Sequence, residues 1–259
     1  MIVAGLDIGS LTIKAVIFEE NKIKGFTIVP TGADANKLTK DCLELTLKRT
    51  GNDFKDLQAI VATGYGRISV PFTDKSITEI TCHAIGANWL NPDTRTVIDI
   101  GGQDSKVISV DQDGRVVDFV MNDKCAAGTG RFLEVMANAL GVKTEELGNE
   151  SLKSKKKITI SSMCTVFAES EVISLIAEGC AKEDIIRGLH EAISNRICSM
   201  ACRLRLENTI ALTGGVAKNI GMVHALKKRL KAKVYVPEEP QIVGALGAAI
   251  AASRILYSE

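Results

Sequence analysis

The tripeptide Asp-Ile-Gly occurs twice, at Asp7-Ile8-Gly9 and at Asp99-Ile100-Gly101, each time at the end of an apolar run. Glycine lets backbone N–H groups approach an anion without a side chain in the way. The aspartate places a carboxylate beside that anion, where it can hold Mg²⁺, usually through water. Neither turn has the glycine and lysine spacing of a Walker loop, and each leads into a strand rather than a helix. The two turns therefore predict phosphate binding of a kind other than a P-loop.

The two turns belong to an internal repeat. Asp7 and Asp99, Gly9 and Gly101, and Lys14 and Lys106 are each 92 residues apart. Each copy is predicted to form three strands, at residues 2–8, 12–18 and 22–29 and at residues 96–100, 105–110 and 115–121. A duplicated sheet unit implies two related halves with a cleft between them. We expect the halves to span residues 1–93 and 94–240, with a final helix within 241–259 that packs back toward the first half.

A third glycine pair, Gly214-Gly215, follows a predicted strand at residues 209–213 and opens a helix. Such a turn lets the backbone approach a flat adenosine closely, although by itself it is also compatible with an ordinary strand-to-helix connection. Further helices are predicted at residues 35–50, 77–90, 130–140, 165–179, 184–206 and 242–256, and further strands at 58–63, 158–161 and 233–236. Strands that alternate with helices predict an α/β fold.

The composition excludes several classes of function. The net charge is +1, so binding to nucleic acid or to a membrane surface has no electrostatic support. The basic run at residues 153–157 is interpreted as a solvated turn. The N-terminus has no basic region before its apolar segment, and the most apolar stretch, residues 243–252, is too short to span a bilayer. We expect a cytoplasmic protein without membrane or nucleic-acid partners.

The chain has seven cysteines, and in a reducing cytoplasm structural disulfides are not expected. Cys125 and Cys164 each stand shortly before a predicted helix, where unpaired N–H groups and the helix dipole favour a thiolate. Iron–sulfur clusters commonly need four thiolates, and a two-fold dimer would double a pair from each chain. From position alone, however, single cysteines are usually core residues. The same interpretation holds for the remaining cysteines: Cys42, Cys82, Cys180, Cys198 and Cys202.

The chain carries Asp-Ile-Gly-Ser near the start, Asp-Ile-Gly-Gly in mid-chain, Thr-Gly-Gly-Val late and a glycine- and alanine-rich segment at residues 244–249. Together these motifs resemble those of the actin, sugar kinase and Hsp70 superfamily. The resemblance implies duplicated actin-like (ribonuclease H-like) ATPase halves with a nucleotide cleft between them. In that superfamily the two turns grip the phosphates of ATP, the late glycine pair contacts adenosine, and helices at the domain interface transmit hinge closure.

A more specific resemblance rests on the segment Cys-Ala-Ala-Gly-Thr-Gly-Arg-Phe-Leu-Glu at residues 125–134, which has Asp-Ile-Gly-Gly-Gln-Asp-Ser-Lys upstream and Cys164 downstream. It resembles the activators of 2-hydroxyacyl-CoA dehydratases, a group related to the ATPase subunits of benzoyl-CoA reductase. The resemblance implies an anaerobic ATPase that delivers a low-potential electron to a dehydratase component. It also implies a homodimer with one [4Fe–4S] cluster held by Cys125 and Cys164 of each chain, and ferredoxin or flavodoxin as electron donor.

The resemblance assigns roles to individual residues. Asp7 and Asp99 would organise Mg²⁺, and Gln103 or Asp104 would orient the attacking water. Gln241 is a nucleotide contact or, equally, a surface residue. The predicted nucleotide-binding residues are Gly9, Ser10, Leu11, Thr12, Ile13, Lys14, Gly101, Gly102, Gln103, Gly128, Thr129, Gly130, Gly214, Gly215, Ala217 and Gln241.

Two other functions use the same turns. A small-molecule kinase of the sugar kinase and actin superfamily would need an acceptor pocket and a base, and neither has a separate motif here. An ATP-gated assembly or chaperone module would need a partner domain or a filament surface, for which 259 residues leave little room. Both alternatives leave Cys125 and Cys164 without a role.

Overall fold

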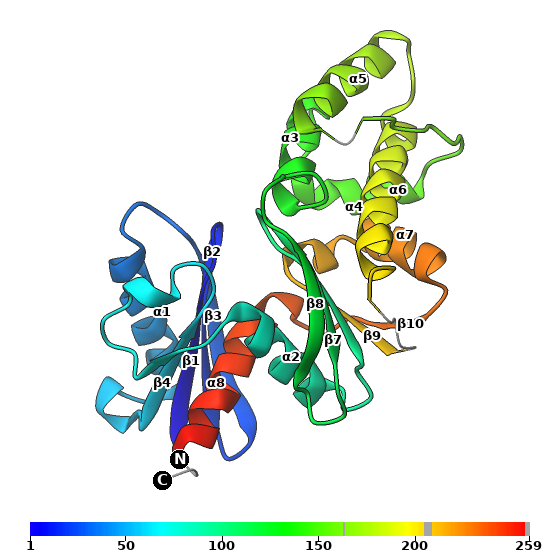
Figure 1. Cartoon of the computed structure of the whole chain (residues 1–259). Helices are drawn as coiled ribbons and strands as arrows, with labels where there is room; N and C mark the ends of the chain where they lie inside the picture. The colour runs from blue at the N-terminus through cyan, green and yellow to red at the C-terminus, as the bar shows by residue number, and fades with distance from the viewer. Residues whose placement is uncertain (163, 205–208, 257–259) are drawn as a thin grey trace.

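Two five-stranded sheets form the framework of the molecule in the computed structural model, which describes residues 1–162, 164–204 and 209–256 (Figure 1). The first sheet has the order β3-β2-β1-β4-β5 and the second the order β10-β9-β6-β7-β8. The strands of the first sheet are β1 (Ile2–Ile8), β2 (Thr12–Glu19), β3 (Lys22–Pro30), β4 (Ala59–Thr63) and β5 (Lys75–Ser76). Those of the second are β6 (Thr96–Ile100), β7 (Ser105–Val110), β8 (Val116–Asn122), β9 (Thr209–Thr213) and β10 (Lys233–Tyr235).

The two sheets have the same topology. In each, the first strand pairs antiparallel with the second, the second pairs antiparallel with the third, and the fourth strand joins the other side of the first in parallel. The strands β1 and β6 therefore occupy equivalent central positions. This arrangement confirms the predicted duplicated α/β fold.

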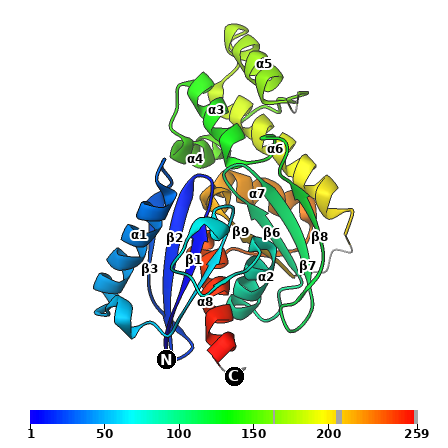
Figure 2. The same ribbon diagram turned by 60° about the vertical axis from the view of Figure 1, so that its left-hand side comes forward.

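The helices cover both faces of each sheet. The first sheet has α1 (Ala35–Thr50) on one face and α8 (Val243–Leu256) on the other. The second sheet has α2 (Glu79–Leu90) on the face toward α8, while α3 (Gly130–Leu140), α6 (Lys182–Ala201) and α7 (Ile220–Leu230) contribute to the core on its other face. The short helix α4 (Leu147–Leu152) packs against α6 and α7. Figure 2 shows α3 and α5 (Thr165–Ala177) at the end of the molecule farthest from both termini.

Helices α2 and α8 pack unusually closely between the two sheets. A β-carbon at Gly86 would overlap the carbonyl oxygen of Val243, and one at Gly247 would overlap the carbonyl of Cys82. The small residues of both helices let their backbones meet. The two helices therefore form one connected layer that touches both sheets.

This close contact makes Gly247→Ala a sensitive test of the interface. Alanine normally stabilises a helix by about 1 kcal/mol relative to glycine. Here the added methyl group overlaps backbone atoms, and overpacking of this kind costs about 1–3 kcal/mol. We expect a net loss of stability, seen as a lower midpoint in urea unfolding. A higher midpoint would show that α2 and α8 lie farther apart.

The structure corrects two sequence-based predictions. Residues 158–161 form no strand, because Ile158 and Ile160 pack against α6 instead of pairing with a sheet. The long helix predicted at 184–206 starts earlier, at Lys182, and ends at Ala201; residues 205 and 206 lie outside the described part of the chain. Within the described residues, no helix combines the length and apolar composition needed to cross a bilayer.

His190 on α6 is a buried titratable group outside the cleft between the halves. It is 1% exposed, and burial lowers its pKa from 6.5 to about 4. Below pH 6.5 the unfolded chain binds a proton that the folded chain does not bind, so folding becomes less favourable. The loss amounts to roughly 3 kcal/mol when the pH reaches 4. We expect His190→Gln to remove this part of the pH dependence, measured by urea unfolding from pH 7 to pH 4. Parallel slopes for the two proteins would contradict this assignment.

Candidate nucleotide cleft and thiol site

A cavity of about 830 Å³ opens between the two halves of the molecule. Its walls come from the β1–β2 turn, the β6–β7 turn, the β9–α7 connection and the start of α2. The side chain of Leu11 from the first turn lies against Gly102 of the second, so the two turns face one another. The chain thus brings its two Asp-Ile-Gly motifs to one concave site.

The two turns are built in the same way. The N–H of Gly9 donates to the carbonyl of Thr12 at 3.0 Å, and the N–H of Gly101 donates to the carbonyl of Asp104, also at 3.0 Å. These four residues keep the offset of 92 found in the sequence. The repeat therefore extends to individual backbone hydrogen bonds.

Each turn is flanked by a carboxylate and an ammonium group on neighbouring strands. Asp7 lies opposite Lys14, with Nζ 3.0 Å from Oδ2, and Asp99 lies opposite Lys106, with Nζ 3.3 Å from Oδ2. Both aspartates are buried, with exposed fractions of 6% and 3%. Buried charges are stable only when paired, so each lysine compensates the charge of its aspartate.

Asp99 has the more elaborate surroundings. The hydroxyl of Thr213 donates to its Oδ1 at 2.9 Å, and Nδ1 of His83 lies 3.5 Å from the same oxygen. Burial by itself would raise the pKa of Asp99, but His83, Lys106 and the bond from Thr213 outweigh it and lower the pKa to about 2. Asp99 is therefore a carboxylate at every pH at which the protein is expected to work.

Lys106 is shared by three carboxylates. Besides Asp99 it reaches Asp104 at 2.9 Å and Glu79 at 3.6 Å. Burial would lower the pKa of Lys106, yet the three carboxylates outweigh it and raise the pKa above its ordinary value. Burial raises the pKa of Glu79, an effect opposed by Lys106. The surroundings of the second turn therefore contain more carboxylates than ammonium groups, a composition suited to Mg²⁺.

The β9–α7 connection completes the cavity. Gly214 has a φ of +85°, which favours glycine, and a β-carbon there would overlap the carbonyl of Ile100. Gly215 faces the side-chain amide of Gln241, whose Nε2 lies 3.2 Å from where its β-carbon would stand. Gly214 thus allows the connection to pack closely against the end of β6, and both glycines line the cavity.

The structure places most of the predicted nucleotide-binding residues on the cavity wall, but not all. Ile13 and Ala217 are buried in the cores of the two halves. Gly128 packs against Arg196, and Thr129 is fully buried with its hydroxyl bonded to the carbonyl of Ala126. The predicted residues that line the cavity are Asp7, Gly9, Ser10, Leu11, Thr12, Lys14, Asp99, Gly101, Gly102, Gln103, Asp104, Gly130, Gly214, Gly215 and Gln241.

Glu79 and His83 are among the cavity side chains that were not predicted as site residues. Glu79 and His83 stand one helical turn apart on α2 and both face Asp99 and Lys106. Their four-residue spacing on a predicted helix is the signal that the sequence offered. It was insufficient, because only the packing of α2 between the sheets turns that helix face toward the cavity.

Helix α3 is attached directly to the second turn. The N–H groups of Gly130 and Arg131 donate to the carbonyls of Gly101 and Gly102 at 2.9 and 2.8 Å. A β-carbon at Gly130 would stand 3.3 Å from the carbonyl oxygen of Gly101, so the contact is tight. Any displacement of the second turn is therefore passed to the start of α3.

Cys125 lies in the loop between β8 and α3. Helix α3 begins five residues after Cys125, at Gly130 as predicted, with Thr129 as its N-cap. The loop is held by Asn122, whose Nδ2 donates to the carbonyls of Cys125 and Ala127 at 2.8 and 3.1 Å. The thiol itself is exposed and free.

Cys164 is the N-cap residue of α5 and is also exposed and free. The segment before it is fixed by Glu171, whose carboxylate accepts the backbone N–H groups of Ser161 and Ser162, both at 2.9 Å. The helix that Cys164 begins packs mainly against α3, the helix attached to the second turn. A continuous set of contacts thus joins the cavity to Cys164.

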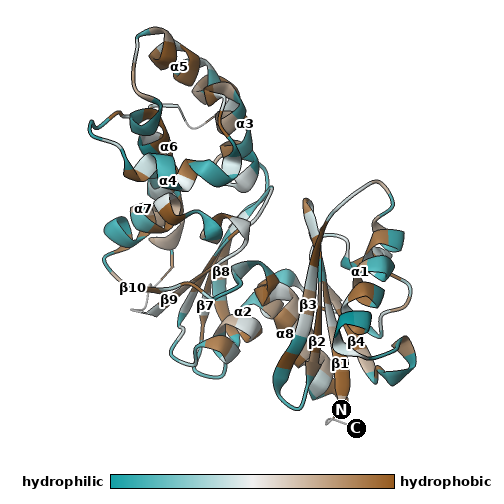
Figure 3. Cartoon of the chain, turned by 180° about the vertical axis from the view of Figure 1, so that it is seen from behind, coloured by the Kyte–Doolittle hydropathy of each residue, from teal (hydrophilic) through white to brown (hydrophobic). Residues whose placement is uncertain are grey.

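Helix α5 exposes an apolar surface. Val166 and Phe167 are each 66% exposed and Ile173 is 55% exposed, while only Ala168 and Val172 of this helix are buried. Figure 3 shows hydrophobic residues along α5 at the end of the molecule. Clustered exposed apolar side chains commonly mark an interface with another protein. Among the described residues, no three His, Cys, Asp or Glu side chains form a metal-binding group within one chain.

Comparisons with known proteins agree with this geometry. A model of the BadF/BadG/BcrA/BcrD ATPase family matches residues 4–252. The chain is 45% identical over 251 residues to the 2-hydroxyisocaproyl-CoA dehydratase activator of Clostridioides difficile, covering 96% of this chain and 94% of that protein.

Two solved structures are similar along the whole chain. Component A of (R)-2-hydroxyglutaryl-CoA dehydratase from Acidaminococcus fermentans matches with a TM-score of 0.95 and 42% identity, covering 99% of both chains. The activator of the 2-hydroxyisocaproyl-CoA dehydratase from Clostridium difficile with bound ADPNP matches with a TM-score of 0.94 and 43% identity, covering 100% of this chain and 96% of that one. The chain belongs to the BadF/BadG/BcrA/BcrD ATPase family.

Proposed function

We propose that this protein is an ATP-hydrolysing iron–sulfur activator that delivers a low-potential electron to a 2-hydroxyacyl-CoA dehydratase or a related CoA-ester reductase. The observation that carries the proposal is the pair of equivalent turns, each beside a buried Asp–Lys pair, facing one another across a single cavity. The names of the similar activators support the choice of partner.

The nucleotide would lie with its phosphates between the two turns and its adenosine near Gly214 and Gly215. Asp7 and Asp99 would hold Mg²⁺, and the lysines beside them would turn toward the phosphate oxygens. The similar activator with bound ADPNP supports the binding of a nucleotide. Gln103 or Asp104 would orient the attacking water, since both line the cavity at the second turn.

Cys125 and Cys164 would supply two of the four ligands of a [4Fe–4S] cluster, and a second copy of the chain would supply the other two. Both thiols are exposed and free, as a shared site requires, whereas Cys42 and Cys82 are buried. The cluster, when bound, supplies a one-electron reductant. The exposed apolar residues of α5 would be covered by the second chain, which supports a homodimer.

Hydrolysis would be coupled to electron delivery through α3 and α5. Residues 1–93 and 94–240 would close around ATP and open after hydrolysis, a hinge motion that nucleotides often control. Because α3 is hydrogen-bonded to Gly101 and Gly102, closure would move α3 and the α5 that packs on it. The loops carrying Cys125 and Cys164 would then change their positions relative to the partner chain. Ferredoxin or flavodoxin in the cytoplasm would be the electron donor.

Analysis of the anaerobically purified protein tests the proposal. We expect a brown dimer containing iron and acid-labile sulfide in amounts that match one cluster for two chains, with ATP hydrolysis. A colourless protein that transfers phosphate to a sugar would replace the proposal with the kinase alternative. That alternative is not favoured, because it gives no role to the exposed thiols of Cys125 and Cys164 or to the apolar surface of α5.

A further inference from the structure

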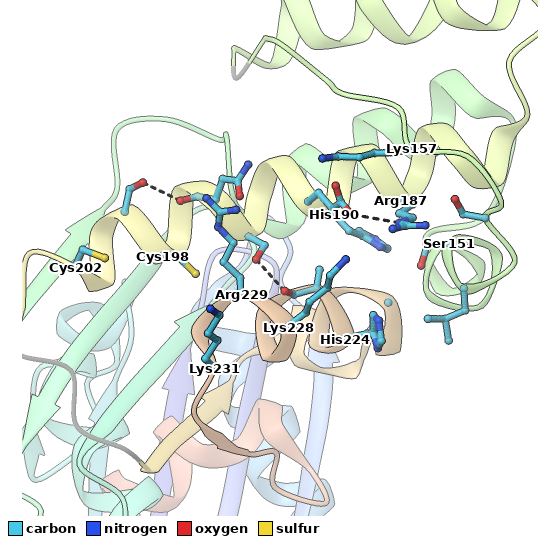
Figure 4. A pocket seen from close by; sticks show the side chains of 18 residues that line it. Ser151, Lys157, Arg187, His190, Cys198, Cys202, His224, Lys228, Arg229 and Lys231 are labelled. Carbon is cyan, nitrogen blue, oxygen red and sulfur yellow. Dashed lines mark hydrogen bonds and ion pairs between the residues drawn. The ribbon is translucent and has the colours of Figure 1, made fainter.

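A second hollow, of about 1030 Å³, lies between α6 and α7, apart from the nucleotide cleft. Figure 4 shows side chains from both helices reaching into it. We call it the α6–α7 groove. The residues of the two Asp-Ile-Gly turns do not line it. The start of α7 lies between the two hollows, since Asn219 lines the cleft and Gly221 lines the groove.

The groove is strongly basic in a protein of net charge +1. One carboxylate, that of Glu191, lines it, and Nε of Arg187 lies 3.2 Å from that carboxylate. The cationic side chains that line it are Lys157, Arg187, Lys228, Arg229 and Lys231. Concave surfaces lined by one sign of charge concentrate ions of the opposite sign.

Most of these cations have no acidic partner among the described residues. In the described part of the chain, none of Lys157, Lys228, Arg229 and Lys231 has a carboxylate within 4 Å. Figure 4 shows Lys228 and Arg229 extending from α7 toward α6, with Arg229 passing close to Cys198. Cationic residues at the end of a helix stabilise its dipole, but that role does not require them to point into a shared hollow.

The floor of the groove holds a buried donor without a partner. Oδ1 of Asn219 accepts the N–H of Met222 at 2.9 Å, so Nδ2 of Asn219 faces Nε2 of His190, at 3.2 Å. Nε2 must then accept, and the proton of the neutral ring is on Nδ1. That Nδ1 has no hydrogen-bond partner among the described residues, although His190 is 1% exposed. Leaving a buried N–H unpaired is unfavourable, and a ligand oxygen would relieve it.

A glycine and several hydroxyl-bearing residues lie around His190 and along the adjoining wall of the groove. Any side chain at Gly221 would overlap Oγ of Ser151 and approach Nδ1 of His190. Ser154, Ser194 and Ser199 also line the groove. Cys198 and Cys202, which the sequence pattern placed in the core, are half-buried and exposed here and belong to the wall.

We propose that the α6–α7 groove binds a small molecule that carries several phosphate groups. Cationic side chains are spaced along the groove, so a single anionic group would leave most of them unpaired. The hollow has the size of a small-molecule site, and hydroxyl groups and an N–H donor stand beside the cations. Lysine and arginine together with such donors are the usual ligands of phosphate.

Calorimetric titration with inorganic tripolyphosphate tests the proposal on the full-length dimer. The nucleotide cleft is first saturated with a non-hydrolysable ATP analogue, at constant free Mg²⁺ and low salt. We expect one site per chain. The double variant Lys228→Gln, Arg229→Gln should bind at least about tenfold more weakly, because it loses two charge-assisted contacts.

Lys227→Gln is the matched control, because Lys227 is an exposed cation on the same helix that does not line the groove. We expect it to change the affinity by less than about twofold. No binding to the wild-type protein, or equal weakening by the control, would overturn the proposal. Tighter binding of polyglutamate than of tripolyphosphate at the same residues would also overturn it, in favour of an acidic protein partner.

The imidazole ¹⁵N spectrum gives a second measurement that needs no variant. Tripolyphosphate should shift the Nδ1–H resonance of His190 and leave that of His83, in the nucleotide cleft, unchanged. A shift at His83 alone would place the anion in the cleft and contradict the assignment.

Discussion

Cys125→Ala and Cys164→Ala are each expected to yield a colourless protein without iron or acid-labile sulfide. By symmetry, one substitution removes two of the four proposed cluster ligands from the dimer. Iron–sulfur clusters require thiolate ligands, and two remaining thiolates do not retain a [4Fe–4S] cluster. Iron and sulfide analysis after anaerobic purification measures the effect, together with the visible absorbance of the wild-type and variant proteins.

Cys202→Ala is the matched control, because Cys202 is also exposed and free but belongs to the α6–α7 groove. It should retain both iron and sulfide. All three substitutions replace exposed side chains, so the free energy of unfolding of the chain itself should change by no more than about 0.5 kcal/mol. A full cluster in the Cys125→Ala protein would remove that residue from the proposed ligands.

Asp99→Asn is expected to lower kcat for ATP hydrolysis by about 100-fold or more, as does removal of other preorganised charged groups from active sites. The carboxylate of Asp99 is ionised over the whole working range, since its pKa is about 2. Asparagine has nearly the same shape but no charge, so Mg²⁺ would lose one of its two proposed aspartates. The turnover of ATP by the purified protein, at saturating Mg²⁺, measures the change.

Asp184→Asn provides the control for loss of a buried carboxylate. Asp184 is 4% exposed and lies outside the cleft, where its Oδ1 accepts the N–H groups of Lys155 and Lys156 at 2.8 and 2.9 Å. Its replacement should lower stability and leave kcat within about twofold of the wild-type value. An Asp99→Asn protein that hydrolyses ATP at the wild-type rate would show that Asp99 does not organise the metal.

The attachment of α3 to the second turn gives the proposed coupling a defined structural route. Two backbone hydrogen bonds join Gly130 and Arg131 to the turn, and α5 packs on α3. Backbone bonds do not depend on side-chain identity, so this connection is retained under most substitutions in the region. The tight fit of Gly130 is the exception, because a larger residue there would push α3 away from the turn.

The internal repeat, and the two equivalent strand–turn–strand units that it implies, could be predicted from local patterns in the chain. The constant spacing of Asp7 and Lys14 and of Asp99 and Lys106 predicted equivalent strand–turn–strand units, and the structure contains them. Pairing across a short turn is a local property, because the turn length and the alternation of side chains fix the register. The turn at Gly214 and Gly215 was also predictable from a local pattern, because the glycine pair directly follows an apolar strand.

The tertiary structure alone decided how distant elements meet. It turned Glu79 and His83 on α2 toward Lys106 and Asp99 and left residues 158–161 unpaired. It also placed His190 and Arg229 in one groove, although they come from different helices. Periodicity in a sequence shows which face of a helix is apolar, but the partner of each face depends on packing against residues far away in the chain, and no local pattern specifies that packing.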